Sequence, residues 1–347
     1  MKRKIALLFG GRGDEHAISC RSAAAIWQAI EDEVTLYPIA IDKNGECFLY
    51  FGEREALLHG SFDRASAIPA ALTQEYGRGG IRSARSFVSI DVAIPALHGN
   101  FGEDGIVQGH LCAVGIPFVG TPTLGGAVSN DKALTKMLAT AIGVPTLRGC
   151  LISASLSLNE VKQSAVSVIG DYPYFIKPNS RGSSIGASPA TDDESLRHAL
   201  QVAAPYGEIL IEPYLSHPRE LEIGLLEVEG QIRLTDIGEI RYTSGFYDFD
   251  AKYQSLRAAI NPHAEIRQEH RDAIVRHTHA LARLLGIRDL ARFDYFLTED
   301  GRLYFNEINP FPGFTQDSLY PILVKDIGFD YKTLLSTLID NAYARGI

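Results

Sequence analysis

Short apolar segments that end close to glycines constrain the fold most strongly. Residues 4–9, 87–97 and 174–177 are largely apolar, and glycines follow each of them within a few positions. Between the first two segments, residues 17–30 carry apolar side chains at helical spacing. Strands that alternate with helices predict an α/β fold with a parallel sheet and crossover helices. Open sheets of this kind bind ligands beyond the carboxyl ends of their strands, so we expect functional residues near the glycines.

The pattern divides the chain into three predicted units: an N-terminal α/β unit at 1–122, a central unit at 123–212 and a C-terminal unit at 213–347. The elements expected within them, in chain order, are a strand at 35–41, an irregular stretch at 60–86, helices at 124–142 and 192–204, strands at 208–212, 219–228 and 231–240, a loop at 244–257, a helix at 266–285, a strand pair at 291–309 and a helix at 328–344.

Composition excludes several functional classes. The 347 residues include 33 basic and 42 acidic side chains, and the resulting net charge of −9 argues against a general nucleic-acid binder. No apolar run approaches the ~20 residues that span a bilayer, so we expect no membrane partner. The four cysteines are widely spaced and form no CxxC motif, which indicates a reducing compartment. We therefore expect a cytoplasmic protein.

The first two glycine clusters carry acidic and imidazole side chains. Gly11 and Gly13 begin a dinucleotide-like motif, but Asp14 and Glu15 stand where a pyrophosphate would bind, which excludes a nicotinamide cofactor. Those carboxylates suit a substrate ammonium, or they only complement the helix dipole. In the second cluster, 98–105, His98 is either a ligand-binding residue or a structural one.

The segment 177–186 has the composition of a phosphate cradle. It begins with Lys177 at a strand end and continues with serines and two glycines, whose free N–H groups can surround an anion. It is not a Walker A loop, because no Gly-Lys-Ser/Thr enters a helix, and a flexible linker is the alternative. Lys132 is a plausible second cation for a nucleotide.

The strand pair 291–309 predicts a metal site. Asp300-Gly301 is typical of a two-residue hairpin turn, which would place Asp294 opposite Glu307 and Arg292 opposite Asn309. Two carboxylates about 5 Å apart repel by roughly 3 kcal/mol at an effective dielectric constant of ~20. A divalent cation would remove that repulsion, and Mg²⁺ prefers such oxygen ligands together with substrate phosphates. The alternative is a solvated face.

Two further segments fit a nucleotide site. The strand end 212–215 can contact an adenine edge through its backbone groups, and a carboxylate such as Glu220 can contact a ribose, although the segment can also be an ordinary strand leaving a sheet. Residues 245–253 contain four aromatic side chains and mixed charge, a composition that suits a lid over a ligand or a buried aromatic plug.

Taken together and in this order, the motifs resemble the D-alanine–D-alanine ligase family of the ATP-grasp superfamily over essentially the whole chain. The resemblance implies an α/β ATP-grasp fold in which an N-terminal parallel α/β domain precedes two α+β subdomains that sandwich ATP. It also implies that ATP drives formation of D-alanyl-D-alanine through a D-alanyl phosphate, for peptidoglycan precursor synthesis and hence cell wall biogenesis and cell shape. The implied cofactors are ATP as co-substrate and two Mg²⁺ ions, with Mn²⁺ as an alternative, and the implied assembly is a homodimer.

The resemblance assigns a role to each motif residue. The catalytic set is Glu15, Ser183, Tyr253, Arg292 and the backbone N–H of Gly313. The amino-acid substrates are assigned to Glu15, His98, Arg292, Ser318 and Leu319. ATP is assigned to Lys132, Lys177, Ser183, Ser184, Glu212, Tyr214, Leu215, Glu220 and Lys252. The metal ions are assigned to Asp294, Glu307 and Asn309.

The last loop departs from the family's pattern. Pro310 stands where the family usually has threonine, Gln316 and Asp317 replace a small polar pair, and Phe311 is unusual. Asp317 brings a carboxylate close to the expected acceptor carboxylate, so D-serine or another amino acid remains an alternative acceptor, for the cell wall or for secondary metabolism. A nucleotide-binding homologue without catalysis is a third hypothesis. It predicts lost metal ligands or phosphate lysines, and this sequence retains both.

Overall fold

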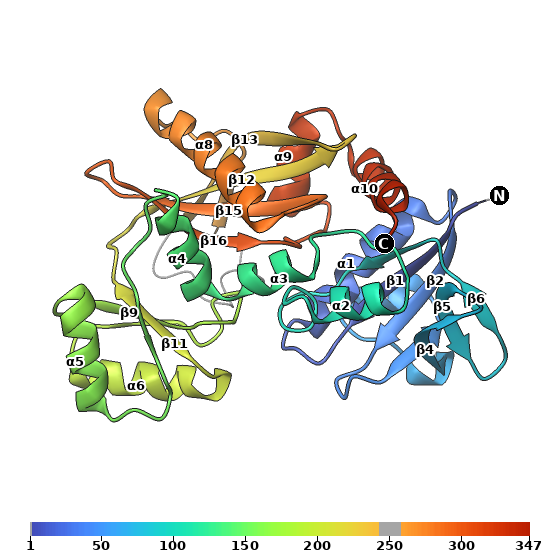
Figure 1. Cartoon of the computed structure of the whole chain (residues 1–347), viewed down its shortest axis with the longest axis horizontal. Helices are drawn as coiled ribbons and strands as arrows, with labels where there is room; N and C mark the ends of the chain where they lie inside the picture. The colour runs from blue at the N-terminus through green and yellow to red at the C-terminus, as the bar shows by residue number, and fades with distance from the viewer. Residues whose placement is uncertain (1, 243–257) are drawn as a thin grey trace.

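The computed structural model describes residues 2–242 and 258–347 and contains three β-sheets that follow one another along the chain (Figure 1). The first sheet has seven strands, the second four and the third five. Within the described residues, no helix is long and apolar enough to cross a membrane. The three sheets and their helices agree with the predicted α/β fold, and the division into domains at 122 and 212 remains a prediction.

The first sheet is parallel only at one end. Strand β1 pairs in parallel with β2 and β7, as the alternating pattern predicted, but β2 to β6 continue as antiparallel neighbours in the order β6-β5-β4-β3-β2-β1-β7. The elements of this part are β1 (Lys4–Gly10), α1 (His16–Ile30), β2 (Thr35–Ile41), β3 (Cys47–Tyr50), β4 (Ala67–Glu75), β5 (Arg78–Ser83), β6 (Phe87–Ser89), β7 (Val92–Pro95) and α2 (Ile106–Ala113), with 3₁₀ helices at Arg54–His59 and Arg64–Ser66.

Three predictions for the first 142 residues are wrong in detail. The stretch 60–86 is not irregular, because β4 and β5 form an antiparallel hairpin there. The apolar run 87–97 is two strands on opposite edges of the sheet, since the chain turns at Asp91, whose carboxylate accepts the Lys4 N–H. The helix expected at 124–142 is divided at Asp131, which ends one helix and caps the next by accepting the Leu134 N–H at 2.9 Å.

The second sheet is antiparallel, in the order β10-β9-β11-β8. Residues at alternate positions of β9 and β11, such as Tyr174, Ile176 and Ile211, are buried in a core with apolar side chains of α5 and α6. The elements of this part are α3 (Thr123–Asn130), α4 (Lys132–Ala141), β8 (Cys150–Ile152), α5 (Leu158–Ile169), β9 (Tyr174–Pro178), β10 (Ser188–Ala190), α6 (Asp193–Ala203) and β11 (Ile209–Pro213), with a 3₁₀ helix at Ala204–Tyr206.

The third sheet is also antiparallel, in the order β14-β13-β12-β15-β16. Helix α9, which the sequence pattern did not predict, packs against β12 and β13. The elements of this part are β12 (Arg219–Val228), β13 (Gln231–Tyr242), β14 (Ala258–Asn261), α8 (Gln268–Leu285), β15 (Leu290–Leu297), β16 (Leu303–Asn309), α9 (Leu319–Asp326) and α10 (Tyr331–Arg345).

The β15–β16 hairpin reaches the predicted pairing by a different route. Its loop has three residues, 299–301, because the Thr298 N–H donates to Arg302 O at 2.9 Å and Gly301 takes a left-handed φ of +82°. That loop alone would pair Asp294 with Asn306. A bulge at Asn306 shifts the register by one residue, so that Asp294 lies opposite Glu307 as predicted.

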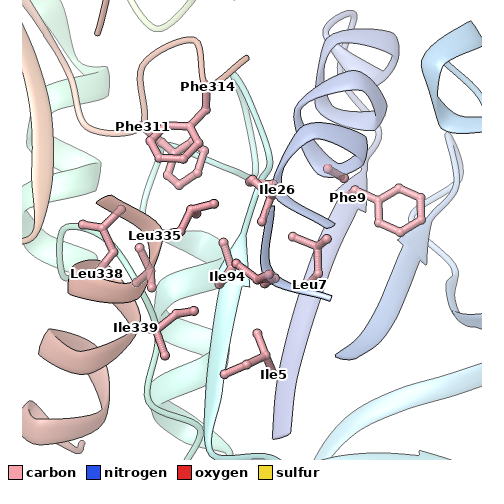
Figure 2. Packing of buried hydrophobic residues seen from close by; sticks show 14 of the residues in the cluster. Ile5, Leu7, Phe9, Ile26, Ile94, Phe311, Phe314, Leu335, Leu338 and Ile339 are labelled. Atoms are coloured by element: carbon pink, nitrogen blue, oxygen red, sulfur yellow. The ribbon is translucent and has the colours of Figure 1, made fainter. Parts of the chain in front are cut away.

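Helix α10 joins the two ends of the chain through one shared core (Figure 2). Its Leu335, Leu338 and Ile339 pack with Ile5 of β1 and Ile94 of β7. The same cluster includes the aromatic side chains of the loop after β16, namely Phe311 and Phe314. The loop is therefore fixed against the first sheet, although it belongs to the third.

Candidate active site

A cavity of about 790 Å³ lies between residues of the second and third sheets. One wall comes from β9, β11 and the loop after β9, and the other comes from β12, β15 and β16. The predicted residues that line it are Lys132, Lys177, Ser183, Ser184, Glu212, Tyr214, Leu215, Glu220, Asp294 and Glu307. The structure thus brings the predicted nucleotide and metal residues around a single space.

The loop after β9 holds two serines in the left-handed region of backbone conformation. Ser183 and Ser184 have φ values of +54° and +56°, which are uncommon for residues with a side chain and concentrate at functional sites. The loop is anchored by Asn179, whose side-chain amide donates to Asp131 and accepts the Ala133 N–H, each at 2.9 Å. The same contacts place the start of α4, and with it Lys132, beside the loop.

The two predicted phosphate lysines face the β15–β16 hairpin. Lys132 Nζ lies 3.5 Å from a Glu307 oxygen and donates to the backbone oxygen of Arg181 at 2.5 Å. Lys177 Nζ donates to Asn306 Oδ1 at 3.3 Å. Burial lowers the pKa of Lys132, and Glu307 opposes that shift. A lysine of α4 and a lysine of β9 therefore lie against a carboxyl and an amide group of the third sheet.

The predicted metal ligands are paired with protein cations. Arg292 donates to Asp294 through two nitrogens at 2.8 Å each, and Asn309 donates to Asp294 at 2.9 Å. Although burial opposes it, Asp294 and Glu222 raise the pKa of Arg292. The expected carboxylate repulsion is thus relieved in this structure by Arg292 and Lys132.

The donor set suits Mg²⁺ only in combination with other ligands. No group of three or more His, Cys, Asp or Glu side chains in the described ranges is arranged to hold an ion. Asp294, Glu307 and Asn309 provide two carboxylates and one amide oxygen. A hard cation that usually keeps waters and substrate phosphates among its ligands fits such a partial set.

Glu15, which follows the first glycine cluster, is connected to the cavity by Ser183, a residue of the cavity lining. The Ser183 hydroxyl donates to the buried carboxylate of Glu15, which stands immediately before α1. Gly99 is required beside it, because a side chain there would collide with the Glu15 carboxylate and its φ is +66°. The prediction that a carboxylate at this helix start is functional therefore gains a structural connection to the serine loop.

His98 lies in a buried polar network on the same side. Its Nε2 is 2.9 Å from Ser22 Oγ and its Nδ1 is 3.6 Å from a Glu103 oxygen. Burial raises the pKa of Glu103, and His98 opposes that shift. The ring of Phe311 lies 5.7 Å from the imidazole, centre to centre. The unusual loop after β16 thus contacts a predicted substrate residue.

That loop also places the remaining predicted residues. Ser318, directly before α9, has its hydroxyl 2.8 Å from that of Thr315, and Gly313 lies close enough for an added side chain to meet Ser318 Oγ at 3.2 Å. Leu319 is buried in α9, whereas Asp317 is exposed. Lys252 and Tyr253, with the predicted lid at 245–253, lie outside the described residues.

Sequence reasoning did not single out several residues around the cavity. Leu147 and Phe175 supply apolar lining. Phe175 shares a face of β9 with Lys177, so the period-2 pattern could have indicated it. Lys136 pairs with Glu212, and Glu222 lies 2.9 Å from Arg292; their signal is weaker, since a charged residue in a helix or strand usually faces solvent.

An N-terminal α/β sheet is followed along the chain by two antiparallel sheets, which enclose a cavity lined by lysines, serines and carboxylates. This arrangement defines an ATP-grasp enzyme. Residues 4–121 match the profile described as D-ala D-ala ligase N-terminus, and residues 138–340 match D-ala D-ala ligase C-terminus. The chain belongs to the D-alanine–D-alanine ligase family and is an enzyme of the ligase class.

Individual relatives cover the whole chain. It is 35% identical to a D-alanine–D-alanine ligase of Mycobacterium sp. (strain KMS), over 99% of this chain and 97% of the relative. Its structure resembles the VanG D-Ala:D-Ser ligase of Enterococcus faecalis, with a TM-score of 0.86 and 30% identity over 99% of this chain and 100% of that one. It also resembles D-alanyl-alanine synthetase A of Vibrio cholerae, with a TM-score of 0.85 and 26% identity over 99% of both chains.

Proposed function

We propose that this enzyme joins two D-alanines to D-alanyl-D-alanine in the cytoplasm, at the expense of ATP, for peptidoglycan precursor synthesis. The observation that carries the proposal is the meeting of Lys132 and Lys177 with the β15–β16 hairpin, at 3.5 Å from Glu307 and 3.3 Å from Asn306. Lysines and carboxylates that face each other across a cavity suit a nucleotide whose phosphates bind the lysines directly and the carboxylates through Mg²⁺.

The reaction has two steps. A carboxylate oxygen of the first D-alanine attacks the γ-phosphorus of ATP, the bond from that phosphorus to the bridging oxygen breaks, and ADP leaves. The amine nitrogen of the second D-alanine then attacks the acyl carbon of the D-alanyl phosphate. The new C–N bond forms as the amine loses a proton, the acyl C–O bond breaks and phosphate leaves.

In this proposal, the residues of the chain hold charges and exclude water. Glu15 binds the ammonium of the first D-alanine, and Ser183 fixes the Glu15 carboxylate. Lys132, Lys177, Ser183, Ser184 and Lys252 bind phosphate oxygens, while Glu212, Tyr214, Leu215 and Glu220 contact the nucleoside. Tyr253, in the predicted lid, completes the enclosure with Glu15 and Ser183, since an acyl phosphate must be kept from water.

The charge that develops at the acyl carbon needs donors placed in advance. We assign that role to Arg292 and the backbone N–H of Gly313. Asp294, Glu307 and Asn309 would hold two Mg²⁺ ions, which would neutralise charge on the transferring phosphoryl group. The hydrogen bond from Arg292 to Asp294 supports this assignment, because it joins the proposed donor to a proposed metal ligand. His98, Ser318 and Leu319 would complete the amino-acid sites, and we propose a homodimer.

The experiment that tests the proposal measures ADP formation with ATP and Mg²⁺ across single and paired D- and L-amino acids and D-lactate. Turnover with D-alanine alone, together with detection of the D-alanyl dipeptide, supports it. No turnover with D-alanine, but turnover with another pair, moves the substrate assignment to that pair.

A D-serine acceptor is the second candidate. It is favoured by the likeness to the D-Ala:D-Ser ligase of Enterococcus faecalis and by Asp317, whose exposed carboxylate stands one residue before Ser318. The carboxylate of Asp317 can accept a hydrogen bond from the hydroxyl group of a D-serine substrate. Faster ADP formation with D-alanine plus D-serine than with D-alanine alone selects this candidate.

A further inference from the structure

Behind the predicted adenine site lies a buried cation that the proposed mechanism does not use. Lys136, on α4, forms an ion pair with one oxygen of Glu212, while Lys177 Nζ lies 2.7 Å from the other oxygen. Lys136 is 5% exposed and Glu212 is 1% exposed. Of the described residues around the cavity, Glu212 and Lys177 belong to its lining and Lys136 does not. One lysine therefore contacts both Glu212 and the cavity, and the other contacts Glu212 alone.

The surroundings of Glu212 suit a planar base. Glu212 lies opposite Phe175 across the β9–β11 pair, and Phe175, Leu147 and Leu215 supply apolar surface to the same cavity. An ionised carboxylate only accepts hydrogen bonds. Adenine presents an amino group as a donor, whereas guanine presents a carbonyl oxygen as an acceptor at the corresponding position. An ionised Glu212 thus attracts adenine and repels guanine, provided that it stays ionised.

Burial by itself drives a carboxyl group toward its neutral form. Although burial opposes them, Lys136 and Lys177 lower the pKa of Glu212. Lys177 is also assigned to phosphate and donates to Asn306, so its three donors are shared among several acceptors when a nucleotide is bound. Lys136 does not belong to the described lining of the cavity, so a bound nucleotide would not compete with Glu212 for its donors.

We infer that Lys136 is a positioning residue for nucleotide choice: it keeps Glu212 ionised and oriented, and so makes the enzyme select ATP over GTP. The inference rests on the proposed function, because it takes the cavity to be the ATP site. It adds a residue whose effect is on which base binds, not on the transfer of the phosphoryl group.

Lys136→Met tests this inference, with binding of ATP and of GTP measured by titration calorimetry at fixed Mg²⁺ without amino acid. Loss of a hydrogen bond to a charged group, in this case the bond from adenine to Glu212, predicts at least about a tenfold loss of ATP affinity. GTP affinity should rise or stay constant, since a protonated Glu212 can donate to the guanine oxygen. The ratio of the two affinities should therefore fall by about tenfold or more. In steady-state assays KM for ATP should rise while kcat changes by less than about threefold.

Lys162→Met is the matched control. Lys162, on α5, pairs with Asp193 at 2.7 Å and does not line the cavity formed by the described residues. The same substitution there should leave the ATP-to-GTP ratio unchanged. Lys136→Arg restores the positive charge and should recover most of the discrimination, which a purely steric role of Lys136 would not predict.

An unchanged ATP-to-GTP ratio in folded Lys136→Met overturns the inference. If that variant does not fold by circular dichroism, Glu212→Gln decides, because an amide can turn a donor toward guanine and should lose the discrimination as well; a retained ratio there overturns the inference. If the unaltered chain binds no ATP, the proposed function fails and the inference fails with it. ATP binding with an unchanged ratio rejects the inference alone.

Discussion

The Ser183 hydroxyl donates a hydrogen bond to the Glu15 carboxylate, which links the loop of the second sheet to the first helix of the N-terminal sheet. The pair therefore connects the proposed phosphate site with the proposed site for the first amino acid. Phosphoryl transfer requires those two substrates to meet in one geometry, and a contact between their binding residues provides it.

Glu15→Gln should raise KM for the first D-alanine by about 10- to 100-fold, because the amide keeps an oxygen for Ser183 but loses the charge that binds an ammonium. KM for ATP should change little. Steady-state ADP formation measures both constants. Glu31→Gln, at the other end of the same helix on an exposed side chain, is the control, and an unaltered D-alanine KM in Glu15→Gln would contradict the assignment.

Glu307→Gln should reduce kcat by at least about 100-fold and raise the Mg²⁺ concentration that gives half-maximal rate. The substitution removes one of two carboxylates that would hold the metal and also releases Lys132 from its ion partner. The rate of ADP formation against Mg²⁺ concentration is the measurement. Glu299→Gln, in the exposed loop of the same hairpin, should behave like the unaltered enzyme. Full activity of Glu307→Gln would contradict the assignment of Glu307 as a metal ligand.

Arg345→Met should destabilise the fold by about 3–5 kcal/mol, since it leaves a buried carboxylate without its partner. Arg345 donates to both oxygens of Asp289, which is 0% exposed and also accepts the Gly120 N–H. Denaturant unfolding gives the change in free energy. Arg302→Met breaks an exposed pair with Asp300 and should have little effect. Equal effects of the two substitutions would show that burial does not determine the difference.

ATP affinity should decline as the pH rises from 7 to 9.5. Burial, with Lys177 nearby, lowers the pKa of Lys136 to about 8, while Glu212 and Glu307 act in the opposite direction. Lys136 is therefore charged below pH 8 and loses its proton above it, which removes the ion partner that orients Glu212 toward the proposed adenine site. Lys136→Arg stays charged over this range and should show a flatter pH profile. Calorimetric titration at several pH values compares the two, and parallel profiles would exclude Lys136 as the titrating group.

The sequence pattern predicted those strands and helices whose apolar residues follow a regular spacing. Strands β1 and β2, helix α8 and strands β15 and β16 follow from apolar runs and helical spacing. The separation of β6 from β7 does not, because an apolar run of uniform character contains no sign of the turn at Asp91. The motifs likewise predicted Lys132, Lys177 and Glu307 around one site, since lysines suit phosphate groups and a carboxylate suits the metal ion that accompanies them.

Long-range pairing explains what the sequence left undetermined. The turn Asp300-Gly301 predicts a hairpin, yet its loop is one residue longer than expected and only the bulge at Asn306 restores the opposition of Asp294 and Glu307. Two departures from the simplest hairpin cancel, so the predicted pairing is confirmed although its route is wrong. Lys136 and Glu222 were missed because their ion partners, Glu212 and Arg292, lie far from them in the sequence and come close only in the folded chain.

Because of helix α10, the hydrophobic core of the first sheet can be completed only late in synthesis of the chain. Its side chains cover part of β1, β7 and α1, so the N-terminal sheet gains that cover from a segment more than 200 residues further along the chain (Figure 2). During synthesis from the N-terminus, Ile5 and Ile94 must remain without these neighbours until residues 335–339 of α10 have emerged. The first sheet, although first to be made, is therefore among the last parts of the molecule to acquire its complete core.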